Sequence, residues 1–340
     1  MDTITQGLLG AAIGQAGFRH RLGGRAVVFG AILGVAPDLD MVARFAGPWA
    51  SLRWHRGPTH ALFWIALATP LVGWLGWRAW RRAGPLRDWI LLAFLALATH
   101  PLLDVCTSWG TQIFLPFSTR RAAIDAIAII DPVYSAPLLG AVVLAATRWG
   151  TGRRARWVAT GVLACTTLYL AFGRGMSQRM TAAGRARLEA DGIRVERIRA
   201  MPMLFGLNQA WLVAARDATG DVHVATGNIY RPDRLAFRRH GTPEDPLVQE
   251  ALTSEPGRTF RWFADGFVTA RIERRADGTA DVVLEDRRYA LASNPARALF
   301  RARARFDADG QLLGMDRGQA RREAGFADEV RAVWADLLGD

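Results

Sequence analysis

Six apolar runs occupy the first half of the chain, and they constrain the fold more than any other feature. A bilayer-spanning helix needs roughly 20 mostly apolar residues, and inside a bilayer the backbone must satisfy its own hydrogen bonds, as helices do. The last four runs approach that length. The first two are short and rich in glycine, which predicts tilted, closely packed spans or a re-entrant pair. The runs lie at about 4–18, 26–37, 60–77, 89–103, 133–147 and 157–173.

The chain changes character after about residue 173, where short strand-like runs alternate with turn signals. Helical stretches are predicted near 174–190 and 318–338. The sequence therefore predicts a mainly α protein: a polytopic helical membrane domain of four to six spans at 1–173, carrying the metal-site motifs. A small, mostly antiparallel β (α+β) soluble domain is predicted at 174–340.

The formal net charge of +12 would suggest a nucleic-acid partner in a soluble protein. Here the arginines cluster in the short connections between apolar runs, where positive residues mark the cytoplasmic side. We therefore expect no nucleic-acid partner. The alternate loops, at about 38–59 and 104–132, then face outward, together with the N-terminus and everything after residue 173. The arginines that set this topology are Arg19, Arg21 and Arg25, then Arg78, Arg81, Arg82 and Arg87, and finally Arg148, Arg153, Arg154 and Arg156.

Four polar signatures interrupt the apolar half: Asp38-Leu39-Asp40, His55-Arg56-Gly57-Pro58-Thr59-His60, His100-Pro101-Leu102-Leu103-Asp104 and Asp131-Pro132. An ionisable side chain beside a membrane span is costly, so it marks a functional site by default. The arginine-based topology places every candidate ligand at or near the outward end of its run. This agreement predicts one metal site on one membrane face, with the candidate ligands Asp2, Asp38, Asp40, His55, His60, His100 and Asp104.

The spacing within the signatures suits a shared site. His100 and Asp104, four residues apart, fall on one helix face, although Pro101 predicts a helix break at His100. Gly57-Pro58 allows a turn that brings His55 and His60 together. Carboxylates with imidazoles favour Zn²⁺, with Mn²⁺ or Fe²⁺ as alternatives, and the lack of a thiolate argues against a structural zinc finger. Such a site acidifies water and polarises a phosphoryl or acyl oxygen, and two metal ions would clamp a phosphate ester.

These motifs, together with Met1-Asp2-Thr3-Ile4-Thr5, resemble the YdjM-type membrane-bound metal-dependent hydrolases, which are grouped with zinc-dependent phospholipases C and zinc nucleases. The resemblance covers about residues 1–135. It implies a helical domain in the bacterial inner membrane, a divalent metal ion and hydrolysis of phosphoesters. Where that family commonly has Thr-His near the N-terminus, this chain has Thr5-Gln6, so one imidazole is missing. Asp2 and another group would then have to complete any second metal site.

The leading hypothesis is a membrane-bound metal-dependent hydrolase that cleaves a phosphoester of a lipid or envelope molecule through a metal-activated water. Asp38, Asp40 and His60 are the predicted catalytic residues, membrane lipid is the expected partner, and the C-terminal domain faces the periplasm. The alternative is a metal-stabilised scaffold or sensor without turnover, which Gln6 and the lack of an identifiable general acid keep open. A metal-ion carrier would need charges deep within several spans, and here they cluster near one face.

Two residues of the second signature have alternative roles. Arg56 is either a phosphate clamp or an anchor at the membrane interface. Thr59 either supports a ligand from outside the metal's coordination shell or caps a helix.

Overall fold

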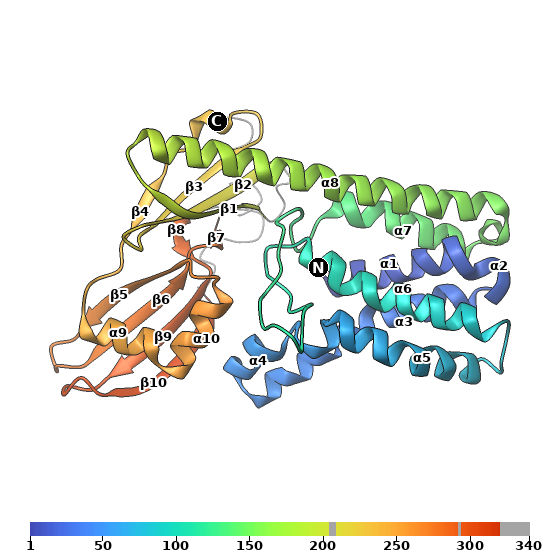
Figure 1. Ribbon diagram of the computed structural model, residues 1–340, viewed down its shortest axis with the longest axis horizontal. Helices are drawn as coiled ribbons and strands as arrows, with labels where there is room; N and C mark the ends of the chain where they lie inside the picture. The colour runs from blue at the N-terminus through green and yellow to red at the C-terminus, as the bar shows by residue number, and fades with distance from the viewer. Residues whose placement is uncertain (204–208, 292–293, 320–340) are drawn as a thin grey trace. The chain divides into compact units, whose positions relative to one another are not determined.

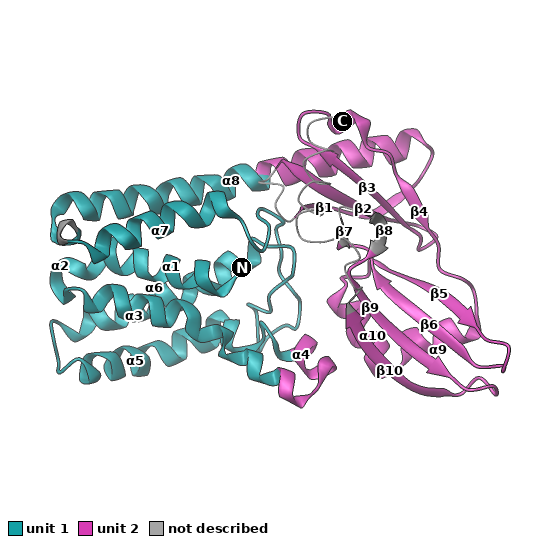
Figure 2. Cartoon of the chain, turned by 180° about the vertical axis from the view of Figure 1, so that it is seen from behind, with its two compact units in different colours: residues 1–43, 54–174 teal, residues 44–53, 175–340 magenta. Residues whose placement is uncertain are grey.

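The computed structural model describes residues 1–203, 209–291 and 294–319. The chain divides into two compact units (Figure 2). The first contains Met1–Ala43 and Trp54–Arg174, and the second contains Arg44–Arg53 and Gly175–Asp340. The domain boundary expected at residue 173 stays a prediction, because helix α8 runs unbroken across it from Arg153 to Ala190.

The first unit is a bundle of helices (Figure 1). Asp2 caps α1, which continues through one π-helical stretch into α2, and α3 continues through 3-10 turns beyond Pro37. The helical segments are α1 (Thr3–Ile13), the π-helix Gly14–Phe18, α2 (Arg19–Leu22), α3 (Arg25–Val35), the 3-10 segment Ala36–Ala46, α4 (Pro48–Trp54), the 3-10 turn Pro58–His60, α5 (Leu62–Ala79), α6 (Leu86–Val105), α7 (Pro132–Ala146), the 3-10 turn Arg148–Thr151 and α8 (Arg153–Ala190).

Within the described residues, four helices are long and apolar enough to cross a membrane: Arg25–Ala46, Leu62–Ala79, Leu86–Val105 and Arg153–Ala190. This confirms the predicted range of four to six spans. These four helices do not correspond to the last four apolar runs, which were the ones expected to approach the length of a span. The second run is lengthened by the 3-10 turns after Val35, whereas α7 starts at the Asp131 cap and reaches only 15 residues.

Glycines bring α1 and α3 into backbone contact. A methyl group added at Gly10 would lie 2.1 Å from the carbonyl oxygen of Gly30, far inside van der Waals distance. One added at Gly34 would lie 2.4 Å from the carbonyl oxygen of Gln6. The structure thus has the close packing that small residues allow between two helix backbones.

The arginine-rich connections lie together at one end of the bundle. In both views α2, the α5–α6 connection and the α7–α8 connection occupy that end, and the N-terminus lies at the other (Figures 1 and 2). At the arginine-rich end Arg21 forms an ion pair with the buried carboxylate of Asp88 (2.8 Å). The three arginine-rich connections therefore share one end of the bundle, as the positive-inside pattern predicts.

The second unit contains two antiparallel sheets of four strands, in the orders β1-β2-β3-β4 and β10-β9-β6-β5, and a two-stranded β7-β8 pair. This confirms the predicted mostly antiparallel β domain. Its elements are β1 (Val195–Pro202), β2 (Ala210–Asp217), β3 (Val222–Asn228), the 3-10 turn Pro232–Arg234, β4 (Arg238–His240), α9 (Pro246–Thr253), α10 (Glu255–Phe263), β5 (Val268–Arg274), β6 (Ala280–Asp286), β7 (Ala290–Leu291), β8 (Asn294–Ala298), β9 (Phe300–Phe306) and β10 (Leu312–Gln319).

The core of this unit contains the central strand β6 and the contact between α8 and the first sheet. Every residue of β6 is buried, and the C-terminal part of α8 packs on the first sheet through Met180. That part of α8 covers the helix predicted near 174–190. The helix predicted near 318–338 falls almost entirely outside the described residues. Residues 44–53 join this unit, where the Trp49 indole donates to the carbonyl of Met315 (3.2 Å).

Candidate metal centre

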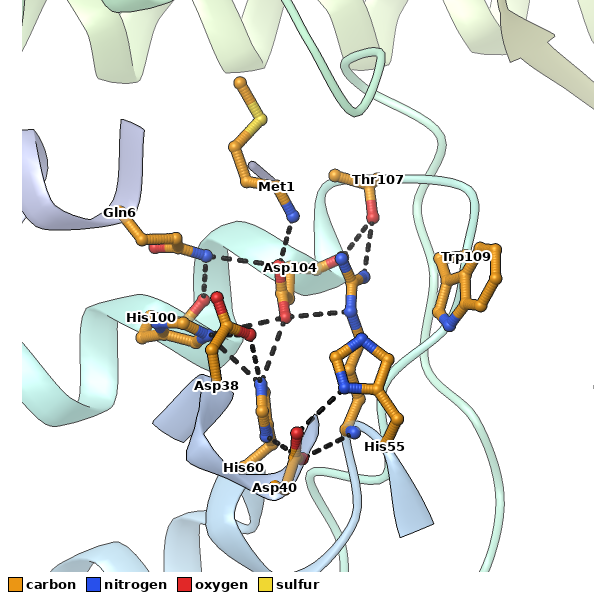
Figure 3. A network of polar contacts seen from close by, with 12 residues as sticks. Met1, Gln6, Asp38, Asp40, His55, His60, His100, Asp104, Thr107 and Trp109 are labelled. Atoms are coloured by element: carbon orange, nitrogen blue, oxygen red, sulfur yellow. Dashed lines mark hydrogen bonds and ion pairs between the residues drawn. The ribbon is translucent and has the colours of Figure 1, made fainter. Parts of the chain in front are cut away.

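Three segments of the first unit bring three of the four polar signatures together (Figure 3). The cluster lies beside Met1, at the end of the bundle that carries the N-terminus (Figure 1). The 3-10 segment after α3 supplies Asp38 and Asp40, and the 3-10 turn Pro58–His60 supplies His60. Helix α6 supplies His100 and Asp104 and continues through Pro101, so the predicted helix break is wrong. A proline removes one helical hydrogen bond, and the packing of α6 against α3 and α5 holds the remaining turns.

Two imidazole nitrogens form the centre of the cluster. The Nε2 atoms of His60 and His100 lie 3.1 Å apart. Asp38 Oδ1 lies 3.8 Å from the first and 3.5 Å from the second. Asp104 Oδ2 lies 3.3 Å and 3.7 Å from the same two nitrogens. Asp38, His60 and His100 offer ligand atoms that all lie within 4.8 Å of one another, so they can hold a metal ion.

The outer nitrogens of both rings fix the direction of the inner ones. His100 Nδ1 lies 2.6 Å from the carbonyl oxygen of Gly34, which can only accept a hydrogen bond. His60 Nδ1 lies 3.1 Å from the carboxylate of Asp40. If both rings donate outward, both Nε2 lone pairs point at each other. That contact is repulsive unless a positive charge lies between them. Two nitrogens bound at about 2.0–2.1 Å to one tetrahedral ion lie about 3.4 Å apart, close to the spacing seen.

Buried carboxylates favour a positive charge at this point. Burial alone would lower the pKa of His60, but hydrogen bonds and charge from Asp104 and Asp40 outweigh it and raise that pKa above its ordinary value. The His60 side chain is fully buried. The same carboxylates that stabilise a proton there can stabilise a metal cation, and a bound metal ion requires the neutral ring.

Asp104 presents an oxygen suited to a cation. Its Oδ1 accepts from Gln6 Nε2 (3.1 Å) and from the amino group of Met1. Its Oδ2 is buried, forms an ion pair with Arg56 Nε (3.0 Å) and lies 3.3 Å from His60 Nε2. Asp104 is therefore already paired, and its negative charge lies beside the point where Asp38, His60 and His100 could hold an ion.

Asp40 and His55 form a second group with Asp38 that could hold an ion, but hydrogen bonds already occupy it. Asp40 Oδ1 lies 2.8 Å from His55 Nδ1. Asp40 Oδ2 accepts from the backbone N–H of Arg56 (2.8 Å) and from the Thr59 hydroxyl (2.9 Å). The Thr59 hydroxyl thus contacts Asp40 and also lies 2.9 Å from His60 Nδ1. The geometry gives Asp40 the task of orienting His60, as carboxylates beside metal-bound histidines commonly do.

We expect Asp40→Ala to weaken metal binding about 10–100-fold, the usual effect of losing a group that orients a metal-bound histidine. The three residues of the first group remain in this variant, so binding should weaken without being abolished. Competition against a chromophoric chelator measures the change. Asp277→Ala, on an exposed turn of the second unit, is the control and should bind like wild type. Loss of all metal from Asp40→Ala would show that Asp40 is itself a ligand.

Asp2 is not part of either group. Its carboxylate accepts from the backbone N–H (2.9 Å) and hydroxyl (2.6 Å) of Thr5, and it caps α1. Its oxygens are directed at the helix start, as in other N-cap residues, so the structure does not bring this predicted ligand into the cluster. Asp131 has the same task at α7, where it accepts from Val133 and Tyr134. Burial raises the pKa of the Cys106 thiol to about 11, which keeps it from acting as a thiolate ligand.

Arg56 has a role that neither sequence-based interpretation gave it. Its side chain is buried, its Nη1 donates to the Thr107 hydroxyl (3.0 Å) and its Nε approaches Asp104. It holds a backbone φ of 59°, which is uncommon for residues other than glycine. Arg56 thus contacts Asp40 through its main chain and Asp104 through its side chain. Backbone groups such as the Gly34 carbonyl carry no signal in a sequence and could not have been found there.

Fold and site together define a helical membrane protein with a buried histidine–aspartate cluster at one end of its bundle. The chain belongs to the YdjM inner membrane protein family, and the sequence model of that family matches residues 1–179. This confirms the resemblance seen in the motifs and extends it past residue 135. The first unit is therefore that of an inner membrane protein.

Two curated relatives match parts of the chain. An uncharacterized protein of Bacillus subtilis (strain 168), YfhP, is 30% identical over 155 residues, which is 42% of this chain and 46% of the relative. The inner membrane protein YbcI of Escherichia coli (strain K12) is 34% identical over 100 residues, 28% of this chain and 57% of the relative. The chain thus spans about half the length of these relatives. No solved structure matches it.

Proposed function

We propose that this protein is a membrane-bound metal-dependent hydrolase that acts on phosphoester bonds. The observation that carries the proposal is the pair of Nε2 atoms of His60 and His100, 3.1 Å apart with their outer nitrogens engaged elsewhere. Paired imidazoles held in this way are common in metal sites, where an acceptor on the outer nitrogen fixes the tautomer.

Asp38, His60 and His100 would hold the ion, with Asp104 Oδ2 beside them. Two histidines and one carboxylate form the ligand set of many catalytic zinc sites, which keep one position open, whereas structural sites are closed by four protein ligands. Zinc is the ion we propose first, and manganese or iron also suits oxygen and nitrogen donors. When bound, the ion supplies Lewis acidity and lowers the pKa of water.

The protein's own residues prepare the site for this chemistry. The Thr59 hydroxyl (2.9 Å) and the Asp40 carboxylate (3.1 Å) lie at His60 Nδ1, so they can engage the outer nitrogen and leave the inner one free to bind. The Gly34 carbonyl does the same for His100. The side chain of Asp38 is 10% exposed, against 1% for Asp104, so Asp38 lies at the more open side of the cluster. Asp38 is therefore the carboxylate best placed to meet a substrate or accept its proton.

The donor set and the place of the site support the substrate class. Hard carboxylate and imidazole donors suit ions that bind phosphate oxygens, and the motifs resemble those of zinc-dependent phospholipases C and nucleases. A site at the end of a membrane bundle favours a lipid or envelope molecule as substrate. The arginines at the other end favour an outward, periplasmic location for the site and for the chain that follows α8.

The scaffold alternative predicts a different response to metal removal. A purely structural ion would be needed for folding, so chelation would unfold the first unit, and no substrate would be turned over. The three-ligand set favours the hydrolase. A metal-ion carrier is disfavoured because the described charged groups of the cluster gather beside Met1, at the end of the bundle that carries the N-terminus, rather than along its length (Figure 1).

The deciding experiment assays detergent-purified protein, loaded with zinc or manganese, on p-nitrophenyl phosphate monoesters and diesters. We expect hydrolysis that EDTA abolishes and the metal ion restores. Asp38→Asn should lose about 1000-fold or more in kcat/KM, equal to about 4 kcal/mol, and Asp277→Asn should keep full activity. Stoichiometric metal binding with no hydrolysis of any of these esters, and unfolding on chelation, would support the scaffold instead.

A further inference from the structure

Six exposed apolar side chains lie on the segments that carry the metal centre or adjoin it. Ile4 at the start of α1 is 76% exposed, Leu39 is 69% and Phe117 is 80%. We call this set of six residues the apolar rim. A water-facing patch of large apolar side chains is unusual unless something binds there. The rim consists of Ile4, Leu39, Met41, Val42, Phe114 and Phe117.

The rim is joined directly to the metal centre. Leu39 stands between Asp38 and Asp40 in the sequence, so the 3-10 segment directs carboxylates inward and apolar side chains outward. Asp38 Oδ2 accepts from the hydroxyl of Thr3 (2.8 Å), which precedes Ile4. The more open edge of the cluster, at Asp38, is thus bordered by the two exposed apolar residues Ile4 and Leu39.

The rim also continues the membrane-facing surface of α5. The Phe117 ring packs edge-on against Phe63 at the start of that helix, with centroids 5.3 Å apart. Phe63, Leu67 and Leu71 are exposed along α5 and would face lipid in a helix that spans the bilayer. The backbone N–H of Leu62 donates to the carbonyl of Ile113, which fixes the loop that carries Phe114 and Phe117.

We propose that the apolar rim inserts into the adjoining lipid leaflet, and that the metal centre receives the phosphate of an amphiphile held in that leaflet. The partner is lipid rather than a protein because the rim is continuous with a surface that already requires lipid. Each large apolar side chain that leaves water stabilises the inserted state. The insertion stands on the exposed residues alone, and the choice of an amphiphilic substrate rests on the proposed function.

Spin labelling tests the insertion without any assay of activity. Nitroxides are placed at Leu39→Cys and Phe117→Cys in a Cys106→Ala, Cys165→Ala background, and the labelled proteins are reconstituted into phosphatidylglycerol–phosphatidylethanolamine vesicles. Leu71→Cys on α5 is the lipid-facing control and Asp277→Cys the aqueous control. We expect both rim labels to collide with oxygen more than with a water-soluble nickel chelate, like Leu71. Collision ratios like those of Asp277 would overturn the proposal.

Matched substrates test the second part. Methyl and dodecyl p-nitrophenyl phosphate share a leaving group, and the dodecyl ester is presented in mixed micelles. We expect Ile4→Ser, Phe117→Ser to lower kcat/KM on the dodecyl ester about tenfold, equal to about 1.4 kcal/mol, and to leave the methyl ester unchanged. Leu71→Ser should change neither value.

The outcomes separate the two proposals. If wild type cleaves both esters equally and the rim variant has the same kcat/KM on each, the proposed amphiphilic substrate is wrong while the proposed hydrolase activity stands. If wild type cleaves neither ester, the hydrolase fails, and the spin labels still decide whether the rim enters the leaflet.

Discussion

Replacing His60 or His100 with alanine removes the bound metal ion, whereas replacing His55 leaves it in place. This result is expected because only the first two rings direct Nε2 at the shared point, 3.1 Å from each other. His55 instead lies against Asp40, 2.8 Å away, and its side chain is 24% exposed. Losing a ligand should cost more than the 10–100-fold typical of a supporting group, so metal content should fall from about one equivalent to below about 0.1.

Elemental analysis of the three purified variants beside wild type measures this directly. His55→Ala is a matched control, because it removes the same side chain from the same signature. Circular dichroism shows that each variant keeps its helices. About two equivalents in wild type, with one lost from His55→Ala, would mean that both groups bind ions and share Asp38. Metal retained by folded His60→Ala would refute the site.

The second large effect concerns folding. Gly10→Ala should destabilise the first unit, because the new methyl group would lie 2.1 Å from the Gly30 carbonyl and the two helices must separate. Forced overpacking of this kind typically costs about 1–3 kcal/mol. Gly140→Ala in α7 meets nothing within 4 Å, and we expect it to be neutral or stabilising by up to about 1 kcal/mol, since alanine favours helix.

Thermal unfolding of the detergent-solubilised variants, followed by circular dichroism, tests these opposite changes in stability. Gly17→Ala, also with open space around it, checks that the effect belongs to the contact rather than to glycine replacement near the N-terminus. A Gly10→Ala variant as stable as Gly140→Ala would show that α1 and α3 can adjust their spacing freely.

The sequence predicted those features that depend on many residues at once. Long apolar runs require helices, and arginines at alternate connections agreed with the placement of the histidines and aspartates at the other end. Individual roles were less predictable. Asp2 has the same carboxylate as Asp38 but starts a helix, so it serves as a cap. Pro101 was expected to break α6, but the helix continues through it because neighbouring helices pack against α6. Buried partners such as Arg56 and Thr107 depend on tertiary contacts that no local pattern encodes.

The carbonyl of Gly34 gives the site a component that side-chain replacement cannot remove. It accepts from His100 Nδ1 at 2.6 Å, and the same glycine allows α1 to pass against α3. An alanine scan of the polar residues would never detect this acceptor. A small displacement of the helix pair would nonetheless change which nitrogen of His100 carries the proton. Variation at apolar positions of α1 and α3, far from any charge, can therefore silence the metal site while every ligand is still present.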